Sequence, residues 1–134
     1  MKSTMFRRAA ACVAAVIIGT LVLASPASAA DVETCTWYGC GGAWGSGSGY
    51  WQQNGDLMWV CDHHADGWSV VVVATFNGSD RKYKWHTAGA NKCTERSYGN
   101  LAEGTGFSFM TCLGKGAENF VAWETCGTAK SATA

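Results

Sequence analysis

The chain has 134 residues with ten basic and ten acidic side chains, and it contains seven cysteines, seven tryptophans and 17 glycines. A chain of this length is expected to form one compact domain rather than two. Its formal net charge of zero excludes the strongly basic composition that is typical of nucleic-acid-binding domains.

The first segment, residues 1–29, has the composition of a secretory signal peptide. Three basic residues lie within the first eight positions, an apolar run covers 9–24, and Ala27-Ser28-Ala29 fits the small-residue cleavage pattern. Gly19 and Thr20 interrupt the apolar run, which is also short for a membrane-spanning helix. We therefore expect cleavage after Ala29, or after the next residue, and a secreted protein rather than a membrane anchor.

Loss of this leader changes both the cysteine count and the charge. Cys12 leaves with it, as do three of the ten basic residues, so six cysteines and seven basic against ten acidic residues remain. The exported chain is mildly acidic and has no basic stripe that could neutralise phosphates or anionic lipids. We therefore expect neither nucleic acid nor a membrane surface as a partner, and we expect a monomer.

An even number of cysteines in a short exported chain predicts disulfide bonds, because nothing keeps thiols reduced outside the cytosol. Order along the chain favours Cys35–Cys40, Cys61–Cys93 and Cys112–Cys126, while the other pairings stay open. Zinc is the alternative, but no C-x-x-C pair occurs and the histidines do not have ligand spacing. We expect no metal ion and no other cofactor.

Residues 30–56 are rich in glycine and aromatic side chains. Glycine at this density loses much backbone entropy on folding, which disfavours a regular element. The composition therefore predicts a loop or an irregular edge, held in place by the Cys35–Cys40 link.

The segment after residue 56 has the pattern of β-strands. Leu57–Cys61 is a short apolar run, and Trp68–Phe76 is a longer run with four consecutive valines, which is typical of a central strand covered on both faces. Residues 62–67 have the composition of a turn, and Asn77-Gly78 is the strongest hairpin signal in the chain.

Three more strands are predicted further along the chain. The alternation over Arg81–Thr87 predicts a half-exposed strand whose Tyr83 and Trp85 face inward. The charges of Lys92–Tyr98 indicate an edge strand. Thr105–Leu113 is predicted to be a strand with apolar side chains on both faces.

Turn signals separate these strands at short intervals, and no helical period occurs outside the leader. This pattern predicts an all-β fold, a small disulfide-bonded β-sandwich or barrel-like antiparallel domain that Phe120–Cys126 closes. We divide the exported chain into a Gly/Trp-rich N-terminal segment (30–56), a β-sandwich core (57–127) and a flexible polar tail (128–134).

No motif for catalysis is present, so no residue is assigned as catalytic. The chain lacks G-x-S-x-G, H-E-x-x-H and a phosphate-binding glycine loop. His63 and His64 would point to opposite faces of an extended segment, and Asp62 and Asp66 fit a turn better than a calcium loop. A triad assembled from distant residues stays open, since such sites are recognised by geometry.

Tryptophan is the residue type in excess, and all seven tryptophans lie beyond the leader. Those in predicted strands are expected to pack in the core: Trp59, Trp68, Trp85 and Trp123. The aromatic residues among the glycines are harder to bury together, and these are the predicted ligand-binding residues: Trp37, Tyr38, Trp44, Tyr50 and Trp51. Exposed rings of this kind stack on sugars or anchor protein partners. The alternative is that they pack as a lid on one sheet.

Residues 58–72 read Met-Trp-Val-Cys-Asp-His-His-Ala-Asp-Gly-Trp-Ser-Val-Val-Val and contain the pattern V-x-D-x-x-A-D-G. Glu103-Gly104 is followed by Phe107-Ser-Phe-Met-Thr-Cys112 and then by Cys126-Gly127. Roughly from Asp56 to Gly127, these motifs resemble a group of small secreted actinobacterial β-rich proteins of unassigned function. The resemblance implies a secreted β-rich domain and carries over no catalytic residue.

The sequence therefore favours a secreted, non-catalytic binding module whose partner is a polysaccharide or a secreted or cell-surface protein. One alternative is a small inhibitor or toxin-like effector that presents a disulfide-pinned loop, such as Cys35–Cys40, to another protein. A small hydrolase is a third, less favoured interpretation.

Overall fold

The computed structural model describes residues 30–134, so the predicted leader lies outside the described residues. The described part consists of nine β-strands and two short 3₁₀ turns, and every strand pair is antiparallel. The prediction of an all-β, sandwich-like antiparallel domain is confirmed.

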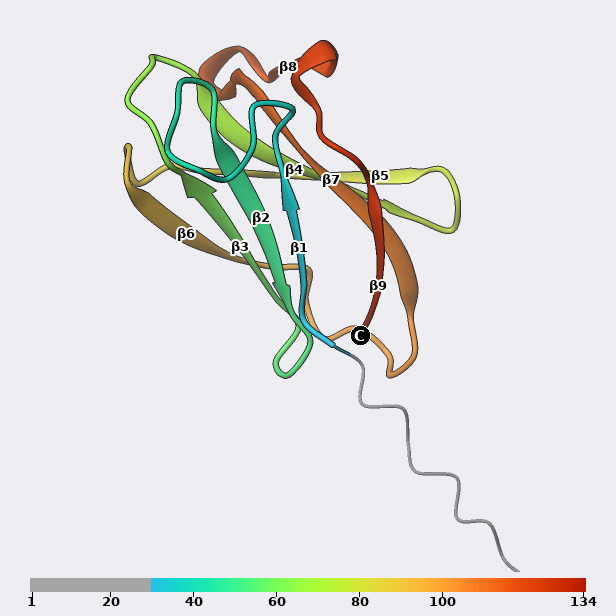
Figure 1. Ribbon diagram of the computed structural model, residues 1–134. Coiled ribbons are helices and arrows are strands. Elements are labelled where there is room, and N and C mark those ends of the chain that lie inside the picture. The colour runs from blue at the N-terminus through green and yellow to red at the C-terminus, as the bar shows by residue number, and fades with distance from the viewer. Residues whose placement is uncertain (1–29) are drawn as a thin grey trace, which may run out of the picture.

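Two sheets form the sandwich (Figure 1). The four-stranded sheet has the order β1-β2-β3-β6 and contains β1 (Val32–Cys35), β2 (Gly47–Gln52), β3 (Leu57–Asp62) and β6 (Lys92–Ser97). The five-stranded sheet has the order β5-β4-β7-β8, with β9 also paired to β7, and contains β4 (Ser69–Phe76), β5 (Asp80–Trp85), β7 (Gly106–Lys115), β8 (Phe120–Ala122) and β9 (Lys130–Thr133). The 3₁₀ turns η1 (Gly116–Glu118) and η2 (Trp123–Thr125) flank β8.

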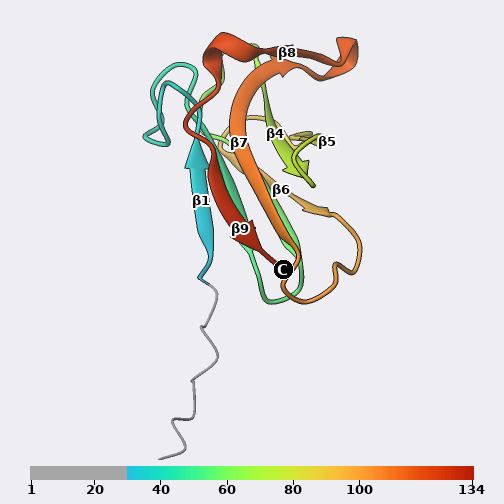
Figure 2. The ribbon, with the colours of Figure 1, turned by 90° about the vertical axis from the view of Figure 1, so that its right-hand side faces the viewer.

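The long strand β7 shapes the second sheet. The C-terminal end of β7 pairs with β8 and its N-terminal end pairs with β9. On its other side, β7 pairs with β4 along almost the whole length of β7. β9 consequently lies beside β1 of the other sheet, and the two strands run in opposite directions (Figure 2).

The core follows the alternation of β4 and β7. One set of their side chains faces the four-stranded sheet and is buried with Trp51 and Met58; this set comprises Val70, Val72, Ala74, Phe76, Phe107, Phe109 and Leu113. The opposite face buries a second cluster, which consists of Val71, Val73, Cys112 and Val121. Both faces of β4 are therefore covered, as the run of four valines predicts.

The glycine-rich N-terminal segment is not only a loop, because it contributes β1 and β2 to the sandwich. Gly47 and Gly49 lie on the inner face of β2, where the sheets approach closely. A Cβ atom on Gly49 would overlap Val72 Cγ2, and one on Gly47 would lie 2.5 Å from Val70 Cγ2. The prediction of a loop or an irregular edge is wrong for residues 32–35 and 47–52, which form regular strands, because glycine here serves close sheet packing rather than chain reversal.

The predicted flexible tail over 128–134 is also wrong, because it contains β9, which pairs with residues 106–109 of β7. The Trp51 indole N–H donates to the Thr133 carbonyl (2.9 Å), and the Ala134 N–H donates to the Thr105 carbonyl (3.0 Å). Phe120–Cys126 therefore does not close the fold.

Strand β5 occurs where the alternation predicts it, but with its faces exchanged. Tyr83 lies opposite Val73 and Trp85 opposite Val71, and these valines point away from the four-stranded sheet. Tyr83 and Trp85 consequently face outward. Because β4 carries valines on both faces, the alternation of side chains along β5 could not show which face of β5 lies toward the inner core.

All three disulfides pair the cysteines that order along the chain favours. Cys61 and Cys93 lie directly opposite each other on β3 and β6, Cys35–Cys40 closes a short turn after β1, and Cys112–Cys126 joins β7 to the segment after η2. Each cross-link restricts the unfolded chain and so stabilises the fold.

Candidate functional site

A disulfide-linked turn over Cys35–Cys40 carries the first of the exposed aromatic residues. The Gly39 N–H donates to the Thr36 carbonyl (2.9 Å), and Gly39 has a φ of 92°, a conformation that favours glycine. Both flanks of the turn bind the start of β2, since the Thr36 N–H donates to the Gly47 carbonyl (3.0 Å) and the Gly47 N–H donates to the Gly39 carbonyl (3.1 Å). The backbone of the turn is thus fixed from both sides.

Two further hydrogen bonds join this turn to its surroundings. The buried Thr36 hydroxyl donates to the Gly45 carbonyl (2.7 Å). The Trp37 N–H donates to the Thr125 carbonyl of η2 (2.8 Å), which belongs to the five-stranded half of the molecule. The turn and η2 therefore lie at the same end of the sandwich (Figure 1).

The loop that follows the turn is held by Asp66. Its Oδ2 accepts a hydrogen bond from the Gly45 N–H (2.8 Å) and its Oδ1 accepts one from the Trp68 N–H (2.9 Å). Asp62 Oδ1 similarly accepts from the His64 N–H (3.0 Å). The two carboxylates thus act in turns, as their spacing predicts.

Tyr38 and Trp44 form an interlocked pair of rings. Their centroids lie 4.9 Å apart, and the ring planes meet at 81°, an edge-to-face arrangement. Gly45, with a φ of 72°, lies beneath the pair, and a Cβ atom there would be 2.5 Å from Tyr38 Cδ2. Tyr38 therefore rests on the backbone at Gly45, so its orientation depends on that glycine.

Trp37, Tyr38 and Trp44 are all exposed on the Cys35–Cys40 turn and the loop that follows it, and we call these three residues the aromatic tip. Their exposed fractions are 75%, 42% and 49%. Large apolar side chains with this exposure on a fixed backbone are typical of a recognition surface.

Tyr50 and Trp51, the other two predicted ligand-binding residues, do not belong to the aromatic tip. Trp51 is 0% exposed and packs edge-to-face on Phe107, with centroids 4.9 Å apart. It cannot contact a ligand, so its assignment as a binding residue is wrong. Tyr50 is half-buried on the outer face of β2, and its hydroxyl donates to Asp31 Oδ2. This hydrogen bond raises the pKa of the Tyr50 hydroxyl above its usual value.

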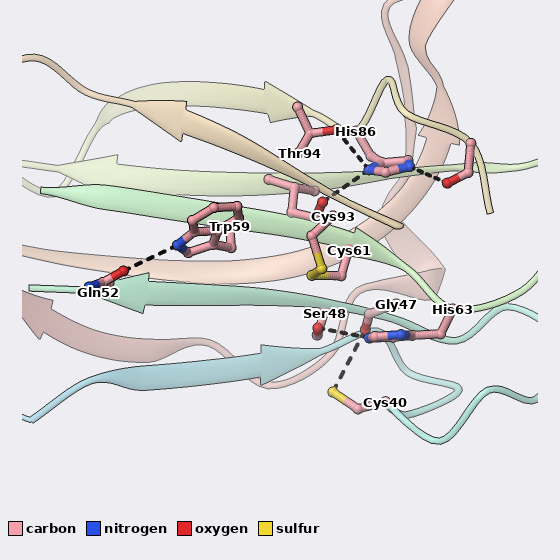
Figure 3. Close-up of a disulfide and its surroundings, with 12 residues drawn as sticks. Cys40, Gly47, Ser48, Gln52, Trp59, Cys61, His63, His86, Cys93 and Thr94 are labelled. Atoms are coloured by element: carbon pink, nitrogen blue, oxygen red, sulfur yellow. Dashed lines mark hydrogen bonds between the residues drawn. A yellow bond between two sulfur atoms is a disulfide. The ribbon is translucent and has the colours of Figure 1, made fainter. Parts of the chain in front are cut away.

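His63 lies beside a hydroxyl group. Its Nε2 is 2.9 Å from Ser48 Oγ (Figure 3), the distance expected between a nucleophile and a general base. Ser48, however, is only 2% exposed, which leaves its Oγ out of reach of a substrate.

His86 lines a cleft of about 500 Å³ together with Asp62, Asp66 and Ser69. Its Nδ1 lies 3.0 Å from the Val60 carbonyl oxygen, and its Nε2 lies 2.7 Å from the Gly89 carbonyl oxygen (Figure 3). With both ring nitrogens close to backbone carbonyls, His86 connects β3 to the loop after β5.

The sequence did not predict a second group of exposed aromatic side chains, which lie on β5, β8 and η2. Tyr83, Phe120 and Trp123 line a hollow of about 330 Å³, and the Arg81 guanidinium lies 5.2 Å from the Trp123 ring centroid. The expectation that Trp123 packs in the core is wrong, because it is 45% exposed. Its position in a 3₁₀ turn rather than a strand explains the difference.

Within residues 30–134, no group of three or more His, Cys, Asp or Glu side chains is arranged to hold a metal ion. The same residues contain no helix long and apolar enough to cross a membrane. Comparison with known protein families, curated proteins and solved structures found no match.

Proposed function

We propose that this protein is a secreted, non-catalytic binding module that recognises a protein ligand through the aromatic tip. Three disulfides suit the oxidising environment outside the cell, and the leader-like residues 1–29 supply a route of export. The observation that carries the proposal is the exposure of Trp37 on a turn that is fixed by a disulfide and by hydrogen bonds.

Rigidity is what makes this exposure useful for binding. A tryptophan presented on a fixed backbone loses little conformational freedom when a partner covers it, so more of its burial contributes to affinity. Tryptophan and tyrosine are also the residues most enriched at the energetic centres of protein interfaces. The aromatic tip supplies two tryptophans and one tyrosine.

The ring geometry favours a protein over a polysaccharide. A flat sugar chain is bound by rings that lie in one plane, but Tyr38 and Trp44 meet at 81°. With Trp51 in the core, the tryptophans at 37, 44 and 51 cannot form a flat platform. An edge-to-face pair makes a corner instead, and such a shape suits an irregular protein surface.

A second candidate function, an inhibitor of a secreted enzyme, is supported by the closure of the turn. Cys35 and Cys40 lie only five residues apart in sequence and hold Trp37 and Tyr38 at the apex between them. An inhibitor would place this apex in the active site of its target, so the same residues would act in both functions.

The experiment compares the disulfide-bonded protein with two variants as immobilised baits for proteins from culture medium and for cellulose, chitin and peptidoglycan. Trp37→Ala removes the most exposed ring of the tip. Phe120→Ala is the matched control, since Phe120 is 49% exposed and lies on β8, outside the aromatic tip. We expect a protein partner that the unmodified chain and Phe120→Ala retain and that Trp37→Ala loses.

Three other outcomes are informative. Retention on an insoluble polysaccharide that Trp37→Ala abolishes would replace the protein ligand with a sugar. A captured enzyme whose activity falls on binding would favour the inhibitor. Equal capture by all three baits would show that the aromatic tip does not bind.

A further inference from the structure

Positive charge is concentrated in one part of the molecule. Five of the seven lysines and arginines in residues 30–134 lie within 80–97, where the acidic residues are Asp80 and Glu95. The remaining described residues hold eight acidic and two basic side chains. The overall acidity therefore conceals a basic region, formed by β5 and β6, that the sequence analysis did not expect.

Three of these cations lie close together beside the open edge of the sandwich. The Lys82 Nζ is 5.1 Å from the Phe76 ring centroid, and the Lys84 Nζ is 4.9 Å from the Tyr98 ring centroid. Because Lys82 and Lys84 are two positions apart on one strand, they lie on the same face of β5.

Arg96 of β6 completes the group and is held in place from β5. Its Nε donates to the Trp85 carbonyl (2.9 Å) and its Nη2 donates to the Thr87 hydroxyl (3.1 Å). A guanidinium has five N–H bonds, so three stay available for another acceptor.

The positive charge of this group is largely uncompensated. Burial first, and then the charges of Arg96 and Lys82, hold the pKa of Lys84 below its usual value. Within residues 30–134 the group has one ion pair, between Lys82 and Asp80, with an N–O distance of 3.9 Å. An anionic group beside these three side chains would therefore be favourable.

The backbone of β5 is open on the same side. β5 ends the order of its sheet and pairs only with β4. The His86 N–H donates to the Val70 carbonyl, so the even-numbered residues of β5 bond to β4 and the backbone groups of Arg81 and Tyr83 point away from the sheet. The bond from Arg96 to the Trp85 carbonyl agrees with this direction and caps one end of the open edge.

We propose that the β5 edge binds an extended acidic peptide segment of a partner protein, which adds to the five-stranded sheet as an antiparallel strand. Side chains repeat every two residues along a strand, at roughly 6.8 Å. Carboxylates at alternate positions of the added strand would therefore lie beside Lys82 and Lys84. Backbone pairing supplies affinity and the charge pattern supplies specificity, as in other cases of strand addition. This site is independent of the aromatic tip.

The test uses a labelled octapeptide of alternating glutamate and valine, titrated with the disulfide-bonded protein and followed by fluorescence anisotropy. Lys82→Gln/Lys84→Gln removes the two cations. Lys115→Gln/Lys130→Gln is the matched control, because it changes the net charge equally at the two lysines of residues 30–134 that lie outside the basic region. We expect the first double variant to bind about tenfold more weakly or worse, as the loss of two charged contacts implies, and the control to retain its affinity.

N-methylated peptides separate strand addition from simple charge attraction. In an antiparallel addition, the residues opposite Arg81 and Tyr83 exchange hydrogen bonds with them, and these are the valines when the glutamates lie opposite the lysines. Methylation of the valine nitrogens should therefore abolish binding, whereas methylation of the glutamate nitrogens should have a smaller effect.

Two results would overturn the proposal. If Lys82→Gln/Lys84→Gln binds the octapeptide as well as the unmodified protein does, these lysines are not the site. If the valine-methylated peptide and dextran sulfate both bind as tightly as the octapeptide and through the same lysines, the surface recognises polyanions in general and does not pair with a strand.

Discussion

Trp37 and Trp51 belong to the same glycine-rich segment but end in opposite environments, one 75% exposed and the other 0% exposed. Trp51 lies on the inner face of β2, packs on Phe107 and donates its indole N–H to the Thr133 carbonyl. Trp37 lies at the apex of a turn whose backbone is held by hydrogen bonds to β2 and η2, while its ring is left uncovered. Position relative to strand and turn, rather than local composition, therefore decides whether an aromatic ring is buried in the core or stays exposed.

Alanine substitution of the two tryptophans should give the largest difference in stability. Trp51→Ala removes a fully buried ring and its hydrogen bond and is expected to lower the free energy of unfolding by about 3–5 kcal/mol. Trp37→Ala removes an exposed ring and is expected to change it by no more than about 0.5 kcal/mol. Urea denaturation followed by circular dichroism would measure both values. Comparable losses in the two variants would contradict the assignment of separate roles.

The disulfides should also differ in how much they stabilise the fold, because one lies within the sandwich and another closes the turn of the aromatic tip. In the chain-entropy model, loss of Cys61–Cys93, with a sequence separation of 32, is expected to lower the free energy of unfolding by about 4 kcal/mol. Loss of Cys35–Cys40, with a separation of five, should lower it by only about 2 kcal/mol.

Paired cysteine-to-serine variants and urea denaturation would test this order. Loss of Cys35–Cys40 should also weaken the proposed binding by the aromatic tip more than its effect on stability implies, because the turn that holds Trp37 loosens. A larger loss of stability without Cys35–Cys40 than without Cys61–Cys93 would contradict the expected division.

Most of the sandwich between residues 57 and 113 could be predicted because its signals are local. Strands β3, β4 and β7 combine apolar runs with turn residues at their ends, and Asn77 and Gly78 both have positive φ, at 49° and 76°. Order along the chain favoured the three disulfide pairs, since each joins cysteines that are consecutive among the six, although it left the other pairings open.

The features that escaped prediction depend on the opposite sheet. Gly47 and Gly49 look like loop residues until Val70 and Val72 are seen packed against them. β9 has little strand propensity and is paired by β7, and the burial of Trp51 requires β9 as a partner for its N–H. In the site, exposure of Trp37, Tyr38 and Trp44 could be anticipated, but their separation from Trp51 could not.

Replacement of Gly45 by alanine should both strain the backbone and displace a ring of the aromatic tip. Gly45→Ala places a Cβ atom against the Tyr38 ring at a residue whose φ is 72°, so we expect the free energy of unfolding to fall by about 1–3 kcal/mol. Tyr38 must also move away from Trp44, which would alter near-ultraviolet circular dichroism. Gly67→Ala is the control, because it has a φ of 79° and no atom within 4 Å of the added Cβ. Equal losses and an unchanged spectrum would show that Tyr38 does not depend on Gly45.

The smallest expected effect on the free energy of unfolding concerns Tyr98, an aromatic residue that is partly buried. Its hydroxyl oxygen is buried without a hydrogen-bond partner among residues 30–134, and burial raises the pKa of this hydroxyl. Its ring nevertheless packs well, with its centroid 5.4 Å from that of Phe76. Tyr98→Phe keeps the ring and removes the unsatisfied oxygen, so the free energy of unfolding should stay the same or rise by up to about 1 kcal/mol.

Tyr50→Phe is the matched control and should be slightly less stable than the unmodified protein, because the Tyr50 hydroxyl has a partner in Asp31. If Tyr98→Phe instead loses stability in urea denaturation, the hydroxyl must have a partner, and burial alone would not describe the environment of this ring.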